Sequence, residues 1–145
     1  MKQLNYIKFE FPARSVNEGF ARAAAAAFAA QLDPTLEELG DIKTAVSEAV
    51  TNAIVHAYPD TVGMVHMRLR ILENNTLEIM VRDRGCGIPD VKQAMEPMFS
   101  TGGEERSGMG FTIMGSFMSG LRVRSTVGKG TTVTMSKIIQ VKGRA

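Results

Sequence analysis

The chain has 145 residues, of which 44% are hydrophobic and 22% are charged, and this size and composition predict one globular domain over residues 1–145. Its formal net charge is only +2, and its 17 lysines and arginines are spread along the sequence, which argues against direct binding to nucleic acid. A single cysteine excludes an internal disulfide, and no bilayer-spanning stretch or secretory signal is recognisable, so we expect a cytoplasmic protein without membrane attachment.

The polarity pattern predicts eight regular elements and one irregular segment. In chain order they are a strand over 5–11, helices over 15–32 and from 35 to about 57, strands over 64–72 and 76–82, a loop over 90–107, a helix over 111–118, and strands over 121–127 and 131–139. This order predicts an α+β fold, a two-layer sandwich in which a mixed, mainly antiparallel sheet carries helices on one face.

Local signals support several of these boundaries. Ser15 with Glu18, and Thr35 with Glu38, have the spacing of capping boxes at the starts of the first two helices. The Asn-Asn dipeptide at 74–75 favours a tight hairpin turn between two strands. The small side chains of the alanine-rich first helix would allow close packing, either within the chain or against a second subunit.

A polar stripe runs along the second predicted helix. Glu48, Asn52 and His56 recur at every fourth position and therefore share one face, whereas most of the surrounding residues are apolar. Polar groups in such a setting must be paired or must line a cavity. One interpretation is an internal hydrogen-bond network. The other is a metal and phosphate site, in which the oxygen of Asn52 suits Mg²⁺ and Glu48 can act as a base.

Three separated glycine pairs follow the stripe, at Gly85/Gly87, Gly108/Gly110 and Gly128/Gly130. The first pair comes directly after a strand and Asp83, whose carboxylate could accept a hydrogen bond from an exocyclic amino group. The second pair opens a helix, where free N–H groups favour phosphate. The third pair precedes Thr131, whose hydroxyl could complete a polar pocket. The spacings differ from those of dinucleotide-binding and P-loop motifs.

Taken together, these segments resemble the four ATP-binding motifs of the superfamily that contains gyrase, Hsp90, histidine kinases and mismatch-repair ATPases. They are Glu48 with Asn52, DRGCG at 83–87, GMG at 108–110 and GKGTT at 128–132. Segments 17–58 and 105–118 are most similar to the anti-sigma F factor family, which are serine kinases of spore-forming bacteria. The resemblance covers essentially the whole chain and implies the Bergerat-type ATP-binding fold.

The resemblance also implies roles for individual residues in a protein that binds ATP or ADP with Mg²⁺. Asn52 would ligate the metal, Glu48 would be the general base, and Arg106 would lie near the terminal phosphate. The full nucleotide-binding set would be Asn52, Asp83, Gly85, Gly87, Thr101, Gly108, Gly110 and Thr131. His56 is interpreted as structural.

The partners that the resemblance implies are a sporulation sigma factor of the F type, an anti-anti-sigma protein that is phosphorylated on serine, and a second copy of the chain in a homodimer. Arg22 would contact these partners. A related anti-sigma kinase of a stress response is an alternative. A detached histidine kinase domain would need a phosphoacceptor histidine on a dimerising helix, and the chain offers only His56 and His66. A gyrase-like hydrolase, with Glu48 activating water, is a further alternative.

Two features depart from the family pattern. The segment FSTGGEERSG, at 99–108, is shorter than in close relatives and lacks their lysine, so a lysine contact from this lid to phosphate is not expected. Cys86 stands where an aliphatic residue is usual, and we expect it to border the nucleotide.

Overall fold

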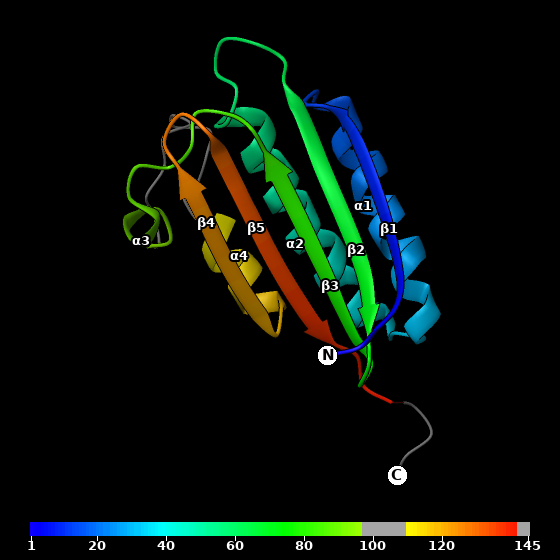
Figure 1. Ribbon diagram of the computed structural model, residues 1–145. Helices are drawn as coiled ribbons and strands as arrows, with labels where there is room; N and C mark the ends of the chain where they lie inside the picture. The colour runs from blue at the N-terminus through cyan, green and yellow to red at the C-terminus, as the bar shows by residue number, and fades with distance from the viewer. Residues whose placement is uncertain (97–109, 142–145) are drawn as a thin grey trace.

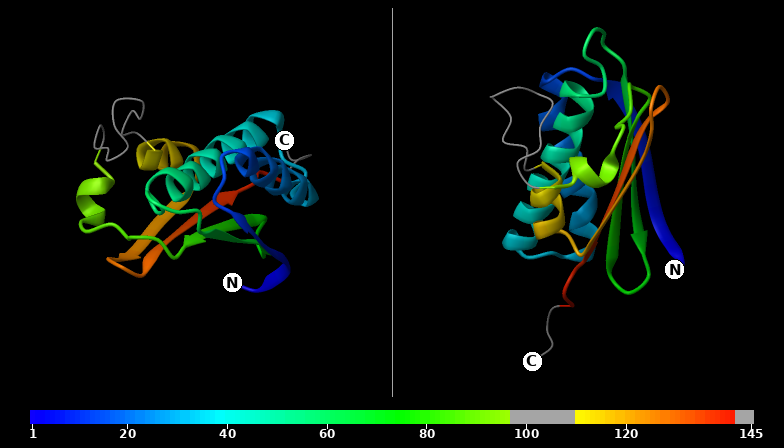
Figure 2. Two further views of the ribbon diagram at one scale, coloured as in Figure 1. Left: turned by 90° about the horizontal axis from the view of Figure 1, so that it is seen from above. Right: turned by 90° about the vertical axis from the view of Figure 1, so that its left-hand side faces the viewer.

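Five strands form one antiparallel sheet, and helices cover one of its faces (Figures 1 and 2). The computed structural model describes residues 1–96 and 110–141. The strands are β1 (Gln3–Pro12), β2 (Met64–Leu72), β3 (Thr76–Asp83), β4 (Gly120–Thr126) and β5 (Gly130–Ile138), in the spatial order β1-β2-β3-β5-β4. Every neighbouring pair is antiparallel. The predicted two-layer α+β sandwich is therefore confirmed.

The helical layer consists of α1, α2 and α4, with α3 beside the β4 edge (Figure 2). Their bounds are α1 (Val16–Ala29), α2 (Leu36–Val55), α3 (Val91–Ala94) and α4 (Gly110–Phe117), and a short 3₁₀ turn over Ala30–Leu32 follows α1. None of these helices has the length and apolar character needed to cross a membrane, within the part of the chain that is described.

The two predicted capping boxes have different outcomes. At the start of α2 the box is formed, since the Glu38 amide donates to the Thr35 hydroxyl at 3.0 Å and the Thr35 amide donates to Glu38 Oε1 at 2.8 Å. At the start of α1 the prediction is wrong. Ser15 already has helical backbone angles and forms no side-chain cap, and Glu18 instead accepts a hydrogen bond from Ser47 on α2. A tertiary partner has replaced the local one.

The hairpin between β2 and β3 turns where the sequence predicts it. Asn74 and Asn75 have φ angles of 64° and 53°, the left-handed conformation that asparagine tolerates in tight turns. The predicted loop over 90–107 is partly wrong, because its beginning contains α3, where Asp90 Oδ1 accepts the Gln93 N–H at 3.0 Å. The rest of that loop, from residue 97 onward, lies outside the described residues.

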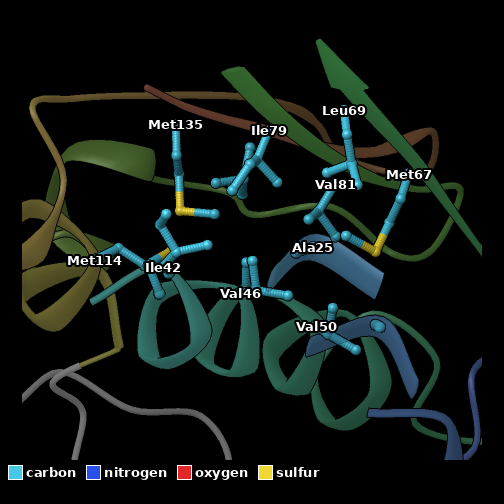
Figure 3. Packing of buried hydrophobic residues seen from close by; sticks show 14 of the residues in the cluster. Ala25, Ile42, Val46, Val50, Met67, Leu69, Ile79, Val81, Met114 and Met135 are labelled. Atoms are coloured by element: carbon cyan, nitrogen blue, oxygen red, sulfur yellow. The ribbon is translucent and has the colours of Figure 1, made fainter. Parts of the chain in front are cut away.

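The core lies between α2 and the sheet (Figure 3). Ile42, Val46 and Val50 of α2 are fully buried and face inward side chains of β2, β3 and β5, among them Leu69, Ile79 and Met135. Helix α1 packs beside α2 through Ala21, Ala25 and Ala29, which have no exposed surface. The alanines therefore serve close packing within the chain on this side of α1.

Candidate functional site

A cavity of about 600 Å³ lies where the C-terminal half of α2 meets the ends of β3 and β5 and the beginning of α4. Segments far apart in the sequence supply its walls. Of the residues singled out in the sequence, the cavity is lined by Glu48, Asn52, His56, Asp83, Cys86, Gly87, Gly110 and Thr131. The fold thus brings residues of all four segments together, namely Glu48 and Asn52 of the first, Asp83, Cys86 and Gly87 of the second, Gly110 of the third and Thr131 of the fourth.

Glu48 and Asn52 stand one above the other on α2 and face the beginning of α4. A Cβ atom at position 110 would lie only 3.2 Å from Asn52 Nδ2 and 3.3 Å from Glu48 Oε2. Gly110 therefore brings the main chain of α4 against both polar groups. Within residues 1–96 and 110–141, neither side chain forms a hydrogen bond or ion pair with protein. This favours a ligand site over an internal network as the reason for the polar stripe.

Asp83 ends β3 and is 7% exposed. Its Oδ1 accepts hydrogen bonds from the amides of Gly85, at 2.9 Å, and Thr131, at 3.2 Å. Burial raises the pKa of Asp83 above its ordinary value, and the two backbone hydrogen bonds oppose that rise. Because both bonds use Oδ1, Oδ2 is available to a ligand in the cavity. The carboxylate is thus held in one orientation by the main chain that surrounds it.

Thr131 is positioned by a residue that the sequence analysis missed. Its hydroxyl lies 2.8 Å from the hydroxyl of Ser125, which faces it across the β4–β5 pair. The Ser125 hydroxyl also accepts the Ile88 N–H at 2.7 Å and donates to the Gly130 carbonyl at 3.0 Å. Ser125 therefore connects the loop after β3 to the β4–β5 hairpin. Only the register of that hairpin could have pointed to it.

The loop after β3 is packed against the end of α2. The Cys86 amide donates to the Ala57 carbonyl at 2.9 Å, and a Cβ atom at position 85 would lie 2.1 Å from that same oxygen. Gly87 has a φ of 78°, and its Cβ would lie 2.4 Å from the Thr126 carbonyl. Positions 85 and 87 thus both require glycine because a side chain at either would collide with the backbone of a neighbouring segment.

Cys86 and His56 lie next to each other on the cavity wall. The Cys86 side chain is exposed, and its Sγ donates a hydrogen bond to the His56 carbonyl at 3.2 Å. His56 is the C-cap residue of α2. The backbone of His56 thus ends the helix, and the structural interpretation of its side chain stays a prediction.

Arg22 lies apart from the cavity. It is exposed on α1 and forms an ion pair with Glu18 at 3.5 Å, one helical turn away. Glu18 also accepts the hydrogen bond from Ser47, the neighbour of Glu48 in α2. Three predicted site residues, Thr101, Arg106 and Gly108, lie outside the described residues.

Comparisons with known proteins agree with this geometry. The family model of the histidine kinase-like ATPase domain matches residues 11–137. An anti-sigma F factor of Caldanaerobacter subterraneus subsp. tengcongensis is 56% identical over 140 residues, which cover 96% of this chain and 97% of that protein. Another, of Geobacillus kaustophilus, is 55% identical over 137 residues, which cover 93% of each chain.

A solved structure is similar in fold. The RsbU and RsbW domains of Rv1364c from Mycobacterium tuberculosis align with a TM-score of 0.70 at 19% identity, over 97% of this chain and 34% of that one. This likeness concerns the fold alone, whereas the curated relatives share more than half of their residues with this chain. The chain therefore belongs to the histidine kinase-like ATPase domain family and, within it, to the anti-sigma F factors.

Proposed function

We propose that this chain is a single ATP-binding domain that inhibits a sporulation sigma factor of the F type and transfers phosphate from ATP to a serine of an anti-anti-sigma protein. The observation that carries the proposal is the convergence of Glu48, Asn52, Asp83, Gly110 and Thr131 on one cavity. A carboxylate acceptor lies at one wall, and a carboxylate, a carboxamide and a helix start lie at another. This distribution fits the two ends of an adenine nucleotide.

The adenine end would be at Asp83. Its carboxylate can accept a hydrogen bond from the exocyclic amino group through Oδ2, while Oδ1 holds the Gly85 and Thr131 amides. The Thr131 hydroxyl and the backbone near Gly87 would line the base. The buried setting of Asp83, at 7% exposure, strengthens such a bond because water competes poorly there.

The phosphate end would be at α2 and α4. The first N–H groups of α4 favour a phosphate, and Gly110 lets them approach Asn52. The Asn52 oxygen is a hard ligand, and it would hold Mg²⁺ together with phosphate oxygens and water, as Mg²⁺ usually requires. When bound, the metal neutralises charge on the phosphates. Gly108, Thr101 and Arg106 would complete this end, with Arg106 offsetting the charge on the terminal phosphate.

Glu48 would act on the protein substrate. Its carboxylate accepts the proton of the serine hydroxyl, the serine oxygen forms the new bond to the terminal phosphorus, and the bond from that phosphorus to the bridging oxygen of ADP breaks. The position of Glu48 beside Gly110 supports this role, because it brings a carboxylate to the end of the cavity where the terminal phosphate would lie.

The partners follow from family membership and from exposed residues. The relatives are named anti-sigma F factors, which supports a sigma factor as partner and an action in the cytoplasm, where bacterial transcription takes place. We propose that the chain acts as a homodimer and that Arg22 contacts the partners, since Arg22 is exposed and its ion pair with Glu18 can open at low cost. A stress-response kinase is disfavoured because relatives that share more than half of their residues with this chain are named anti-sigma F factors.

A histidine kinase reaction is also disfavoured by the placement of the histidines. His56 is a cavity residue at the end of α2, and His66 lies in β2, where it contacts Glu10 at 3.0 Å. His66 is therefore in a strand, and His56 ends a helix that packs into the core of the domain.

Incubation with labelled ATP, Mg²⁺ and a candidate anti-anti-sigma protein tests the proposal. We expect label on a serine of the partner. Label on a histidine of the chain itself, or free phosphate with no labelled protein, would contradict the proposed reaction. Glu48→Gln should retain ATP binding and lose transfer by about 10²-fold or more, as expected for a general base. The matched control is Glu37→Gln, an exposed acid in the first turn of α2, which should transfer at the normal rate.

A further inference from the structure

The face of the sheet that points away from the helices carries a cluster of positive charge at the β3–β5–β4 side. This face is not covered by any helix of the described chain (Figure 2). The strand register places Arg82, Thr132 and Arg124 in one row across β3, β5 and β4. Neighbouring strands are about 4.8 Å apart, so the two arginine backbones stand roughly 10 Å apart on either side of Thr132. Their long side chains can therefore reach one shared ligand.

A pocket of about 330 Å³ lies at this row, and we refer to it as the outer pocket. Its cationic lining residues are Arg82, Arg84, Arg124 and Lys129, and Thr126 and Thr132 add hydroxyl groups. Asp83 is the one acidic residue among those lining it, but its carboxylate oxygen Oδ1 is bonded to the Gly85 and Thr131 amides. The outer pocket is thus surrounded mainly by donors and positive charge.

Apart from Asp83, no acidic residue of the described part of the chain lines the outer pocket. The carboxylates on the same face are engaged elsewhere, since Glu78 contacts Arg70 at 2.7 Å and Arg68 at 3.3 Å, and Glu10 contacts His66 at 3.0 Å. None of the four cations forms an ion pair within residues 1–96 and 110–141.

Arg82 gives a second and independent observation. Its Nε is buried and has no hydrogen-bond partner among the described residues. Buried donors in folded proteins are nearly always paired, with protein, water or a ligand. Arg68 Nε, outside the outer pocket, is in the same state, so it is the position of Arg82 among three other cations that points to an anionic acceptor here.

We propose that the outer pocket binds a phosphate group, as a free phosphate or as a phosphorylated side chain of another protein. Guanidinium groups match phosphate oxygens with two parallel N–H donors, and the hydroxyls of Thr126 and Thr132 can donate to the remaining oxygens. The pocket volume is several times the roughly 30 Å³ that one water molecule occupies, so a tetrahedral anion fits with its hydration shell.

The outer pocket and the cavity proposed for ATP, which we call the nucleotide cavity, share two lining residues, Asp83 and Thr131, but the cations of the outer pocket do not line the nucleotide cavity. Successive residues of a strand point to opposite faces, so Arg82 and Thr132 face outward whereas Asp83 and Thr131 face the helices. The proposal therefore does not depend on the proposed kinase reaction, and either can fail without the other.

NMR titration of the full-length, ¹⁵N-labelled protein tests the proposal. The probes are inorganic phosphate, a phosphoserine peptide and the same peptide without phosphate. We expect saturable shifts of the Arg82 and Arg124 side-chain Nε–H signals with phosphate, and none with the unphosphorylated peptide. Saturation by the phosphopeptide assigns the pocket to a protein-borne phosphate, and saturation by inorganic phosphate alone assigns it to a free one.

Arginine variants distinguish specific binding in the outer pocket from nonspecific attraction of phosphate to the positive charge of this face. Arg82→Gln with Arg124→Gln should weaken phosphate binding about tenfold or more, and Arg124→Gln alone, on the exposed edge strand, should weaken it measurably without affecting the fold. The matched control is Arg122→Gln, which removes the same charge from β4 outside the pocket and should change binding less than about twofold. Equal weakening by the control, or shifts only at Asn52 and Gly110 in the nucleotide cavity, would overturn the proposal.

Discussion

Replacing Asp83 by asparagine separates the folding role of this residue from its proposed role in adenine recognition. An asparagine oxygen can still accept the amides of Gly85 and Thr131, which Asp83 Oδ1 accepts at 2.9 Å and 3.2 Å. The change therefore removes a buried charge but preserves both backbone hydrogen bonds. At the Oδ2 position it puts an amino group, a donor, where the exocyclic amino group of adenine requires an acceptor.

The stability of Asp83→Asn follows from the raised pKa of the carboxyl group. The native state binds this proton more tightly than the unfolded chain, whose pKa is close to 3.8. The free energy of unfolding of the wild type therefore falls as pH rises from 3.8 through the folded pKa of Asp83. The lowered stability persists at neutral pH. We expect the variant to be at least as stable as the wild type at pH 7, with an advantage that shrinks on acidification.

Nucleotide affinity should change in the opposite direction. Loss of one hydrogen bond to a charged acceptor costs roughly 1.5–3 kcal/mol, which corresponds to a roughly 10- to 150-fold weaker Kd. Calorimetric titration with ADP, together with urea denaturation across the acid range, measures both effects. The control is Asp60→Asn, an exposed acid after α2, which should leave ADP binding unchanged. ADP binding by Asp83→Asn within twofold of the wild type would refute the adenine assignment.

Further predictions concern the metal, the cysteine and the helix cap. Asn52→Ala should weaken Mg-ATP binding about tenfold but weaken metal-free ATP binding much less, and equal losses in the two titrations would contradict a metal-ligand role. Because Cys86 is exposed and lines the nucleotide cavity, an alkylating reagent should modify it more slowly with Mg-ATP present, and unchanged rates followed by mass spectrometry would count against its placement at the nucleotide. Thr35→Ala removes the cap of α2 and should lower the free energy of unfolding by about 1 kcal/mol in urea denaturation, whereas Ser15→Ala, at a residue without a cap bond, should change it little.

The sequence predicted the fold well wherever the determinants are local. The α2 cap needs only Thr35 and Glu38 in one helical turn, and the β2–β3 turn needs only two residues that tolerate positive φ. The capping box at Ser15 failed because Glu18 found a partner on another helix, which no local pattern encodes. Helix α3 was missed because four residues are too few to show a helical period.

The site, too, could be predicted from the sequence only where its determinants are local. Glu48 and Asn52 could be grouped from helical spacing, and Asp83 could be placed at a strand end, but their convergence is a property of the tertiary fold. Ser125 was missed because its importance comes from the register of β4 with β5 and from the Ile88 amide, which lies 37 residues away in the chain. A serine in a strand gives no sign of such contacts.

The turn at Asn74 and Asn75 has a consequence at the far end of its hairpin. It sets how β3 is aligned with β2, and β3 extends for eight residues, roughly 25 Å, before it delivers its last side chain to the nucleotide cavity. Sliding β3 by a single position would turn Asp83 outward and present the guanidinium of Arg82 to the base. The same slide would also turn the buried Leu77, Ile79 and Val81 to solvent, so the core face of β3 and the turn together keep the acidic side chain at the cavity.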